Sequence, residues 1–240
     1  MPGLYKDEGI VLRSIKLGEA DRIVTVYTRE NGKVRAVAKG VRKTKSRFGG
    51  RLEPYTRVQL LIYRGRNLDT ITSADILEPF PTLTKEYTRL ASAAAMAELI
   101  EKITPDRESS FSTYALLLGG LQALAGENGG AALPAFLMKV LSVSGYHPEL
   151  KNCAGCGAPG LHGGFSPAQG GAVCEGCWRE DHASIGMHPD RIALMSRLLK
   201  EEFGSAADPL EVDEVTQALR AYAEYHLERP LRSFQMLKAV

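Results

Sequence analysis

Four cysteines form the most specific chemical pattern in this sequence. They make two Cys-x-x-Cys pairs, Cys153 with Cys156 and Cys174 with Cys177, with seventeen residues between the pairs. Two such pairs at this separation can place four thiolates tetrahedrally around a zinc ion, at about 2.3 Å from the metal. Because sulfur would fill every coordination position, none remains for water or a substrate. The pattern therefore predicts one structural Zn²⁺, with a reactive dithiol or an iron site as the alternatives.

The residues around the cysteines support this interpretation. Segment 157–173 is rich in glycine and proline, so metal binding would supply folding energy that its few large apolar side chains cannot. Glycines at 155, 157 and 176 would permit tight turns around the sulfurs. We expect the neighbouring His162 and His182 to lie at the surface and not to bind the metal. In a reducing cytosol, closely paired cysteines favour a metal over disulfides.

A second candidate site is a basic run over residues 39–51. It contains three glycines, no carboxylate and six cations, namely Lys39, Arg42, Lys43, Lys45, Arg47 and Arg51. This composition suits a mobile loop that lies along a phosphodiester backbone, where each neutralised phosphate releases counterions. The alternative is an ordinary solvated basic face. Phe48 in the run, and Tyr27, Tyr55 and Tyr63 nearby, could stack on unpaired bases, although single tyrosines on strands are more often core or rim residues.

The charge distribution points to the same end of the chain. Residues 1–66 contain 16 Lys and Arg against 6 Asp and Glu, a balance of +10. The remaining residues contain 14 against 22, a balance of −8, so the net charge of +2 hides a strong asymmetry. Such a split indicates that the N-terminal part meets a polyanion.

The elements that would position the basic run are predicted to be short β-strands. Five segments are rich in β-branched residues and partly alternate between apolar and polar positions: 9–15, 22–28, 33–38, 56–63 and 70–76. Asn31 and Gly32 tolerate positive φ, which favours a tight hairpin between the second and third strands. Five antiparallel strands in about eighty residues favour a small closed barrel of the OB type. An SH3-like barrel is the rival on pattern alone.

The pattern becomes helical after Pro79 and Pro81, where Thr82 could cap the first helix. Apolar residues then recur at three- and four-residue spacing over five segments: 83–103, 109–125, 133–144, 190–203 and 212–227. The second of these segments is mildly interrupted at Gly119-Gly120. The predicted protein is of the α+β class with two domains. An OB-fold barrel spans residues 1–80, and a helical domain spans 81–240 with the four-cysteine zinc segment inserted at 150–180.

Several classes of protein are disfavoured by the sequence. No apolar run approaches the ~20 residues that span a bilayer, and the first residues lack the apolar core of a signal peptide, so we expect a cytoplasmic protein without a membrane partner. Neither a Gly-x-Ser-x-Gly nor a His-Glu-x-x-His motif is present, and the histidines are scattered. We therefore expect a protein that is not an enzyme.

The N-terminal segments resemble a known family. The stretches 9–12, 17–24, 27–33, 38–43 and 46–54 closely resemble the N-terminal region of the bacterial recombination-mediator family RecO. The later part resembles that family in the order of its features: helices, two Cys-x-x-Cys pairs, then more helices. One departure from a common OB pattern is that no helix is evident between the third and fourth strands, where the basic run stands and leaves the path over the barrel open.

This resemblance implies a function and assigns residues to it. It implies an OB-fold domain that binds single- and double-stranded DNA, promotes strand annealing and, with RecR, loads RecA onto strands coated by single-strand-binding protein (SSB), in the RecF pathway of DNA repair and homologous recombination. By position, the six cations of the basic run would contact phosphates and the four cysteines would hold zinc. Such a protein would work at the nucleoid.

Some assignments stay open at this point. Glu19 and Asp21 could form hydrogen bonds in a hairpin or contact a basic surface on RecR. An SSB tail could dock in a groove with an apolar floor and a basic rim, formed by Leu194, Leu198, Arg191, Arg197 and Lys200, although the same spacing describes an ordinary core face. A zinc-bearing RNA-binding module of the translation machinery is the alternative function, and a protein adaptor with an acidic partner is a third.

Overall fold

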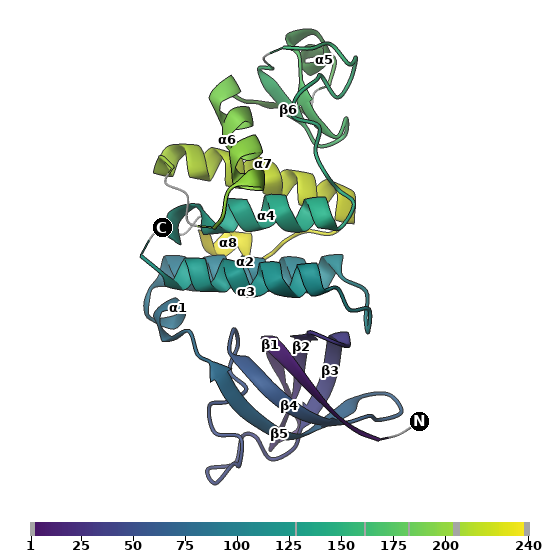
Figure 1. Cartoon of the computed structure of the whole chain (residues 1–240), viewed down its shortest axis with the longest axis vertical. Coiled ribbons are helices and arrows are strands. Elements are labelled where there is room, and N and C mark those ends of the chain that lie inside the picture. Colours follow the sequence, from purple (N-terminus) through teal and green to yellow (C-terminus); the bar gives the residue numbers. More distant parts are fainter. Residues whose placement is uncertain (1–2, 128, 161, 182, 204–206, 238–240) are drawn as a thin grey trace. The chain divides into compact units, whose positions relative to one another are not determined.

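The chain folds into two compact units, which are described separately. The computed structural model describes residues 3–127, 129–160, 162–181, 183–203 and 207–237 (Figure 1). The first unit is Met1–Leu121 and the second is Gln122–Val240. The division into domains 1–80 and 81–240 stays a prediction, because the first compact unit also contains residues 81–121.

A closed barrel of five strands forms the N-terminal part of the first unit. Its strands are β1 (Leu4–Leu17), β2 (Asp21–Thr28), β3 (Gly32–Ala38), β4 (Arg57–Tyr63) and β5 (Asp69–Glu78). They follow the order β1-β2-β3-β5-β4, and β1 closes the barrel by pairing with both β2 and β4. All pairs are antiparallel except the short one between β3 and β5. The predicted five-stranded OB-type barrel is confirmed.

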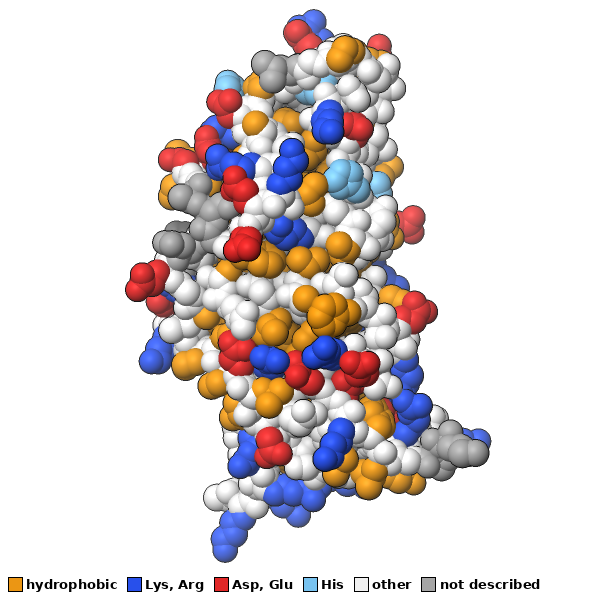
Figure 2. Space-filling model, in the orientation of Figure 1, with side chains coloured by type: hydrophobic (Ala, Val, Ile, Leu, Met, Phe, Trp, Pro, Cys, Tyr) orange, Lys and Arg blue, Asp and Glu red, His pale blue; other side chains and the backbone are white. Residues whose placement is uncertain are grey.

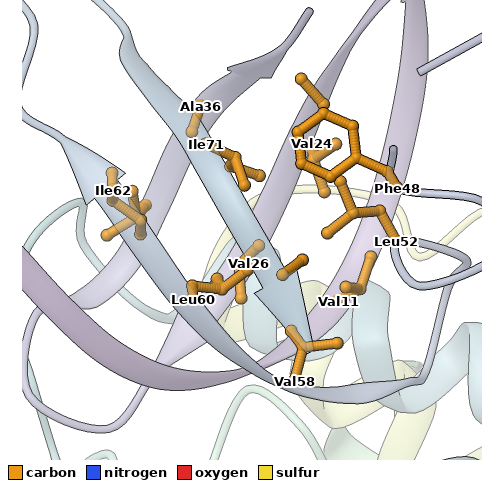
Figure 3. Packing of buried hydrophobic residues seen from close by; sticks show 13 residues of the cluster. Val11, Val24, Val26, Ala36, Phe48, Leu52, Val58, Leu60, Ile62 and Ile71 are labelled. Carbon is orange, nitrogen blue, oxygen red and sulfur yellow. The ribbon is translucent and has the colours of Figure 1, made fainter. Parts of the chain in front are cut away.

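Strict alternation along the strands builds the barrel core. In β3 and β4 every second residue is buried, which turns one set of side chains inward and the other outward. The inward set is aliphatic and is joined by two side chains from the connection between β3 and β4, Phe48 and Leu52 (Figure 3). That connection contains the basic run, and the structure describes no helix in it, as predicted.

Strand β1 begins earlier than the sequence pattern indicates. The prediction started at residue 9 because Lys6, Asp7 and Glu8 interrupt the apolar pattern. In the structure these residues pair with β4, and the buried carboxylate of Asp7 accepts hydrogen bonds from the backbone N–H groups of Glu30 and Asn31. The strand therefore accommodates the charged Asp7, because its carboxylate holds the turn between β2 and β3.

The first unit continues with α1 (Pro81–Lys85), α2 (Tyr87–Ile103) and the start of α3 (Phe111–Ala125). The prediction of one helix from residue 83 to 103 was wrong, because Glu86 adopts an extended conformation that separates α1 from α2. Thr82 lies inside α1 and does not cap it; Phe80 occupies the N-cap position. Helix α3 continues through Gly119 and Gly120 without the expected interruption.

Helices α2 and α3 cover part of the outer face of the barrel, and α2 packs against β1. The Lys33 ammonium donates to the backbone carbonyls of Glu101 and Thr104 at the end of α2, at 2.6 Å each. The Tyr114 hydroxyl of α3 donates to Glu8 on β1. Tyr27 points away from the barrel core, yet it is fully buried under this cover. This part of the outer face is therefore closed to any ligand.

The second unit contains a helical core. Its elements are η1 (Gly129–Ala131), α4 (Ala132–Val143), α6 (Pro189–Lys200), α7 (Pro209–Leu227) and α8 (Phe234–Leu237). Helix α4 is central, since residues 132–138 are all buried and both α6 and α7 pack against it. Arg191 joins α6 to α7 through ion pairs with Glu211 at 2.7 Å and Glu214 at 2.8 Å. No helix within the described residues is long and apolar enough to cross a membrane.

The cysteine segment is inserted between α4 and α6. It folds into a small sheet of order β7-β6-β8, formed by β6 (Gly164–Ser166), β7 (Gly171–Val173) and β8 (Ile185–Gly186), with one short helix, α5 (Glu175–Glu180). Phe165 of β6 is fully buried, and its ring centroid lies 5.6 Å from that of Tyr222 on α7. The predicted helical region with an inserted four-cysteine segment is thus confirmed.

Candidate metal centre and candidate nucleic-acid interface

The structure brings the four cysteines together. Cys153 and Cys156 lie in a turn before β6, Cys174 is the N-cap residue of α5, and Cys177 lies within α5. Their Sγ atoms all lie within 4.8 Å of one another, and the Cys156 and Cys174 sulfurs are 3.8 Å apart. A tetrahedral zinc ion with Zn–S bonds of about 2.3 Å would hold its sulfurs ~3.8 Å apart. The cluster therefore fits one metal ion, and its all-sulfur donor set matches zinc.

Local electrostatics also favour a bound cation. Burial raises the pKa of the Cys153 thiol, but hydrogen bonds from the backbone N–H groups of Cys174, Cys156 and Gly155 outweigh it and lower that pKa to about 6. Hydrogen bonds with the other three sulfurs raise the pKa of Cys177 to about 12. A bound cation would favour the thiolate form of Cys177, because a coordinated thiol is deprotonated.

Two of the three predicted glycines have a clear geometric role. A Cβ atom on Gly155 would lie 2.9 Å from the Cys177 sulfur and 2.1 Å from the side-chain oxygen of Gln169. Gly157 has a φ of +75°, which side chains rarely adopt. A Cβ on Gly176 would meet only the Cys174 sulfur at 4.0 Å, so its conformation does not require glycine.

The expectation for the nearby histidines was partly wrong. His162 is buried, and its Nε2 atom lies 3.3 Å from the Lys151 carbonyl oxygen. It packs inside the cysteine segment, because this small fold has too few large apolar residues to do without the ring. His162 does not belong to the cysteine group. His182 lies outside the described residues.

The basic run presents its charges to solvent. Five of its cations are exposed and Arg51 is half-buried. Across the part of the chain that the structure describes, none of the six has a carboxylate oxygen within 4.0 Å. Blue side chains gather at the bottom of Figure 2, over the end of the barrel where this connection lies in Figure 1. These charges are therefore available to a ligand.

The run is a chain of turns with fixed anchors, where the sequence predicted a mobile loop. Phe48 and Leu52 insert into the barrel core. The Asp21 carboxylate accepts a hydrogen bond from the Gly40 N–H at 2.7 Å, and the Arg42 guanidinium donates to the Gly18 carbonyl at 3.0 Å. The backbone that carries the cations is thus held in two ways. It forms hydrogen bonds to residues at the turn between β1 and β2, and it is anchored by the buried side chains of Phe48 and Leu52.

The candidate aromatic residues separate into two kinds. Phe48 and Tyr27 are fully buried, so neither can stack on a base; an aromatic ring among cations and glycines here serves as an anchor. Tyr55 is half-buried, and burial raises the pKa of its hydroxyl. Tyr63, at the end of β4, is 45% exposed.

Three further predictions have different outcomes. Asp21 accepts its hydrogen bond from Gly40 in the basic run and not within the hairpin, so it links the two segments; a contact between the exposed Glu19 and RecR stays a prediction. The proposed groove for an SSB tail was wrong, because Leu194 and Leu198 are buried in the core of the second unit. Arg191, assigned to its rim, is already ion-paired.

Sequence reasoning missed a second exposed cluster. Leu4, Lys6, Tyr63, Arg64 and Arg66 lie together at the far end of β4, because Leu4 pairs directly with Tyr63 and residues 64–68 form the following turn. The excess of positive charge before residue 67 was an available signal. The missing part was the early start of β1, without which Leu4 and Lys6 could not be placed.

Comparisons with known proteins agree over both parts of the chain. The family model described as Recombination protein O N terminal matches residues 1–80, and the one described as Recombination protein O C terminal matches residues 84–235. Similar proteins, each named DNA repair protein RecO, come from Frankia casuarinae (46% identical, covering 98% of both chains), a Nocardioides species (46%, covering 96% of this chain and 97% of the relative) and Thermobifida fusca (42%, covering 98% of both). The chain belongs to the RecO family of DNA repair proteins.

Proposed function

We propose that this protein is a recombination mediator of the RecF pathway that acts on DNA without a catalytic residue. It binds single- and double-stranded DNA, promotes annealing of complementary strands and, with RecR, loads RecA onto strands coated by SSB. Its place of action is the nucleoid in the cytoplasm. The cysteine cluster holds one structural Zn²⁺.

The unpaired cations of the basic run carry this proposal. Several other cations of the first unit have nearby acidic partners: Lys33 lies 3.2 Å from Asp106, and Arg107 lies 2.9 Å from Asp69. The six cations of the run have none within the described residues. A dense group of exposed cations without internal partners is costly unless solvent or a polyanion neutralises it. DNA phosphates supply that partner.

The annealing activity follows from electrostatics. Two complementary strands repel each other through their phosphates, and salt alone screens that repulsion only beyond about 8 Å at physiological ionic strength. A basic surface that neutralises phosphates on both strands lowers the barrier to their encounter. Lys and Arg contacts to phosphates carry no sequence information, so the strands can sample registers until complementary bases pair.

The four-cysteine site supports a structural role for the metal. All four ligand positions are sulfur, which leaves no open position for water activation. The backbone N–H of Cys174 donates to the Cys153 sulfur at 3.3 Å, so the turn also orients the ligands. Zinc therefore holds the small sheet β7-β6-β8 together and takes no part in chemistry on DNA.

Reversal of two charges tests the role of the basic run. We expect Arg42→Glu with Lys45→Glu to weaken binding to all DNA sequences alike and to slow annealing. The slope of log affinity against log salt should become shallower by roughly one unit or more. With fewer phosphate contacts, DNA binding releases fewer counterions. Fluorescence anisotropy with mixed-sequence oligonucleotides at several salt concentrations measures both quantities.

A matched variant controls for the change in net charge. Lys200→Glu with Arg229→Glu alters charge equally, but both residues are exposed in the second unit. This control should keep the wild-type salt slope. An unchanged slope in the Arg42 and Lys45 variant, with folding verified by circular dichroism, rules out the basic run as the phosphate-binding surface. Loss of affinity for one sequence only would point to base reading instead.

A further inference from the structure

A row of paired residues runs across the outer face of the barrel, next to the basic run. Tyr63 of β4 lies opposite Thr70 of β5, and Thr70 lies opposite Val37 of β3. Directly opposed residues share a face of the sheet. Their neighbours Ile62, Ile71 and Ala36 belong to the barrel core, so Tyr63, Thr70 and Val37 point outward. The row ends two residues before Lys39, where the basic run begins.

This row is open, in contrast to the face that the helices cover. Tyr63 is 45% exposed, its partner Leu4 is also exposed, and Thr70 and Val37 are half-buried. Successive strands lie about 4.8 Å apart, so the row from Val37 to Tyr63 is about 10 Å long. An aromatic ring at one end of a short apolar row, with a cationic run at the other, matches how single strands are bound: bases stack on rings and phosphates meet cations.

The charges along the row are complementary to a nucleic acid. Arg35 and Lys39 flank Val37 on β3. Lys6 lies two residues after Leu4, the partner of Tyr63, and Arg66 lies three residues after Tyr63; all four cations are exposed. Residues 61–68 contain no carboxylate. The nearest acidic residue along the chain, Asp69, is fully buried and already accepts hydrogen bonds from Arg107 and Tyr5.

The turn after β4 is held in place. The Arg64 guanidinium lies over the Tyr5 ring, 5.0 Å from its centroid, and donates to the Asn31 side-chain oxygen at 3.0 Å. The Arg64 N–H donates to the Gly3 carbonyl. The turn that carries Arg66 is therefore fixed at its first residue, and Tyr63 stands on a paired strand.

We propose that a single strand of DNA leaves the basic run at Lys39 and crosses the outer face of β3, β5 and β4. One unpaired base stacks on Tyr63, and Arg66 and Lys6 bind the phosphates beside it. This inference rests on the proposed function, in which the basic run binds DNA. It adds a contact that only an unpaired base can make, because bases in a duplex are already stacked. Tyr63 therefore distinguishes single strands from duplexes.

A tryptophan reporter tests the stacking contact directly. The chain has one tryptophan, Trp178, so Trp178→Phe removes the background signal. In that background, mixed-sequence single-stranded DNA should quench the fluorescence of Tyr63→Trp, and duplex DNA of the same length should not. The matched control is Tyr87→Trp, since Tyr87 on α2 is 48% exposed and lies outside the row. Its fluorescence should stay unchanged with either DNA.

Affinity measurements separate this inference from the proposed function. Tyr63→Ala should weaken single-strand binding about five-fold or more, because stacking contributes at least ~1 kcal/mol per base. Duplex affinity and the salt slope should stay as in the wild type, and Tyr63→Phe should bind normally. If the wild type bound no DNA, the proposed function itself would fail. If the wild type binds, but the reporter is not quenched and Tyr63→Ala binds normally, only the strand path is overturned.

Discussion

Phe48 shows how one side chain can be ambiguous in sequence and decisive in structure. Among cations and glycines, an aromatic residue suits either base stacking or attachment of a loop to a core. The structure places it in the barrel core, 1% exposed, beside Leu52 and Val24 (Figure 3). Sequence pattern could not decide between these roles, because the choice depends on whether the barrel end is open to receive the ring.

We expect Phe48→Ala to destabilise the first unit strongly. Removing a fully buried phenylalanine leaves a cavity and costs about 3–5 kcal/mol in the free energy of unfolding. Single-strand affinity should also fall, because the cations lose their fixed backbone. Phe111→Ala is the matched control: Phe111 is 62% exposed, so its loss should cost about 1 kcal/mol or less. Equal destabilisation of the two variants in urea unfolding would show that Phe48 is not an anchor.

Asp69 is a second residue whose role rests on buried contacts. Burial raises the pKa of its carboxyl, but hydrogen bonds from Arg107 and Tyr5 outweigh burial and hold that pKa below the ordinary value of 3.8. The carboxylate accepts from Arg107 at 2.9 Å and from Tyr5 at 2.7 Å. It thus ties the start of β5 to the first strand and to the segment after α2.

The lowered pKa predicts how stability depends on pH. A carboxyl group with a lowered pKa in the folded state stabilises the protein above its unfolded pKa, and this stabilisation is lost as pH falls below about 4. Asp69→Asn should therefore reduce the free energy of unfolding by about 1–3 kcal/mol at pH 7, and by less at pH 3. Asp75→Asn, exposed on the same strand, should change neither value. Equal loss for Asp69→Asn at both pH values would exclude this linkage.

At the scale of elements, the cysteine segment is built from very short strands and one short helix. Its three strands have only two or three residues each, and α5 has six. Elements this short are not stable alone, so the proposed zinc ion would contribute much of the folding free energy of the segment. The packing of Phe165 against Tyr222 attaches the segment to α7.

We expect purified protein to contain one Zn²⁺ per chain, measured by elemental analysis. Cys174→Ser should lose the metal and make residues 150–186 sensitive to limited proteolysis. DNA binding should survive, because the basic run lies in the other compact unit. A chelator should reproduce the proteolysis in the wild type and add nothing to the variant. Protein that holds no metal, or whose cysteines stay disulfide-bonded after reduction, would contradict the assignment.

The elements differ in how far sequence can predict them. Strands β3 and β4 alternate cleanly, so their bounds are close to the predicted ones. The early part of β1 was missed because it depends on a pairing with β4 that no local pattern encodes. The break at Glu86 between α1 and α2 was missed for a similar reason, since glutamate is a good helix former and its local propensity gives no sign of a break.

The candidate sites follow the same division. The cysteine cluster could be predicted because its ligands come in short, fixed spacings. The basic run could be predicted because its composition is extreme over thirteen consecutive residues, 39–51. The row through Tyr63 could not, since it joins residues from three strands and its identity depends on register. A sequence pattern can therefore predict a site whose residues are close in the chain, but not one whose residues are brought together by strand pairing.

At the scale of the whole molecule, the charge asymmetry overstates the surface available to DNA. Several cations of the basic N-terminal part are committed to internal partners. Arg57 is held by Glu8 at 2.9 Å, Arg13 by Glu101 at 2.6 Å, and Lys33 by two carbonyls at the end of α2. What remains unpaired is concentrated in the basic run and along the row that leads to Tyr63. The positions of the unpaired cations, and not the total charge of +10, therefore define the proposed nucleic-acid surface.

The closure of the barrel between β1 and β4 also has a consequence for folding during synthesis. Leu4 pairs with Tyr63, so the hydrogen-bonding edge of β1 stays open until more than sixty residues have left the ribosome. Unpaired strand edges readily pair with other chains. The cations of residues 39–51 leave the ribosome before β4 does, and charges that flank an exposed strand oppose pairing between chains. We therefore expect the charges that are proposed to bind DNA in the finished protein also to oppose association of chains whose barrel has not yet closed.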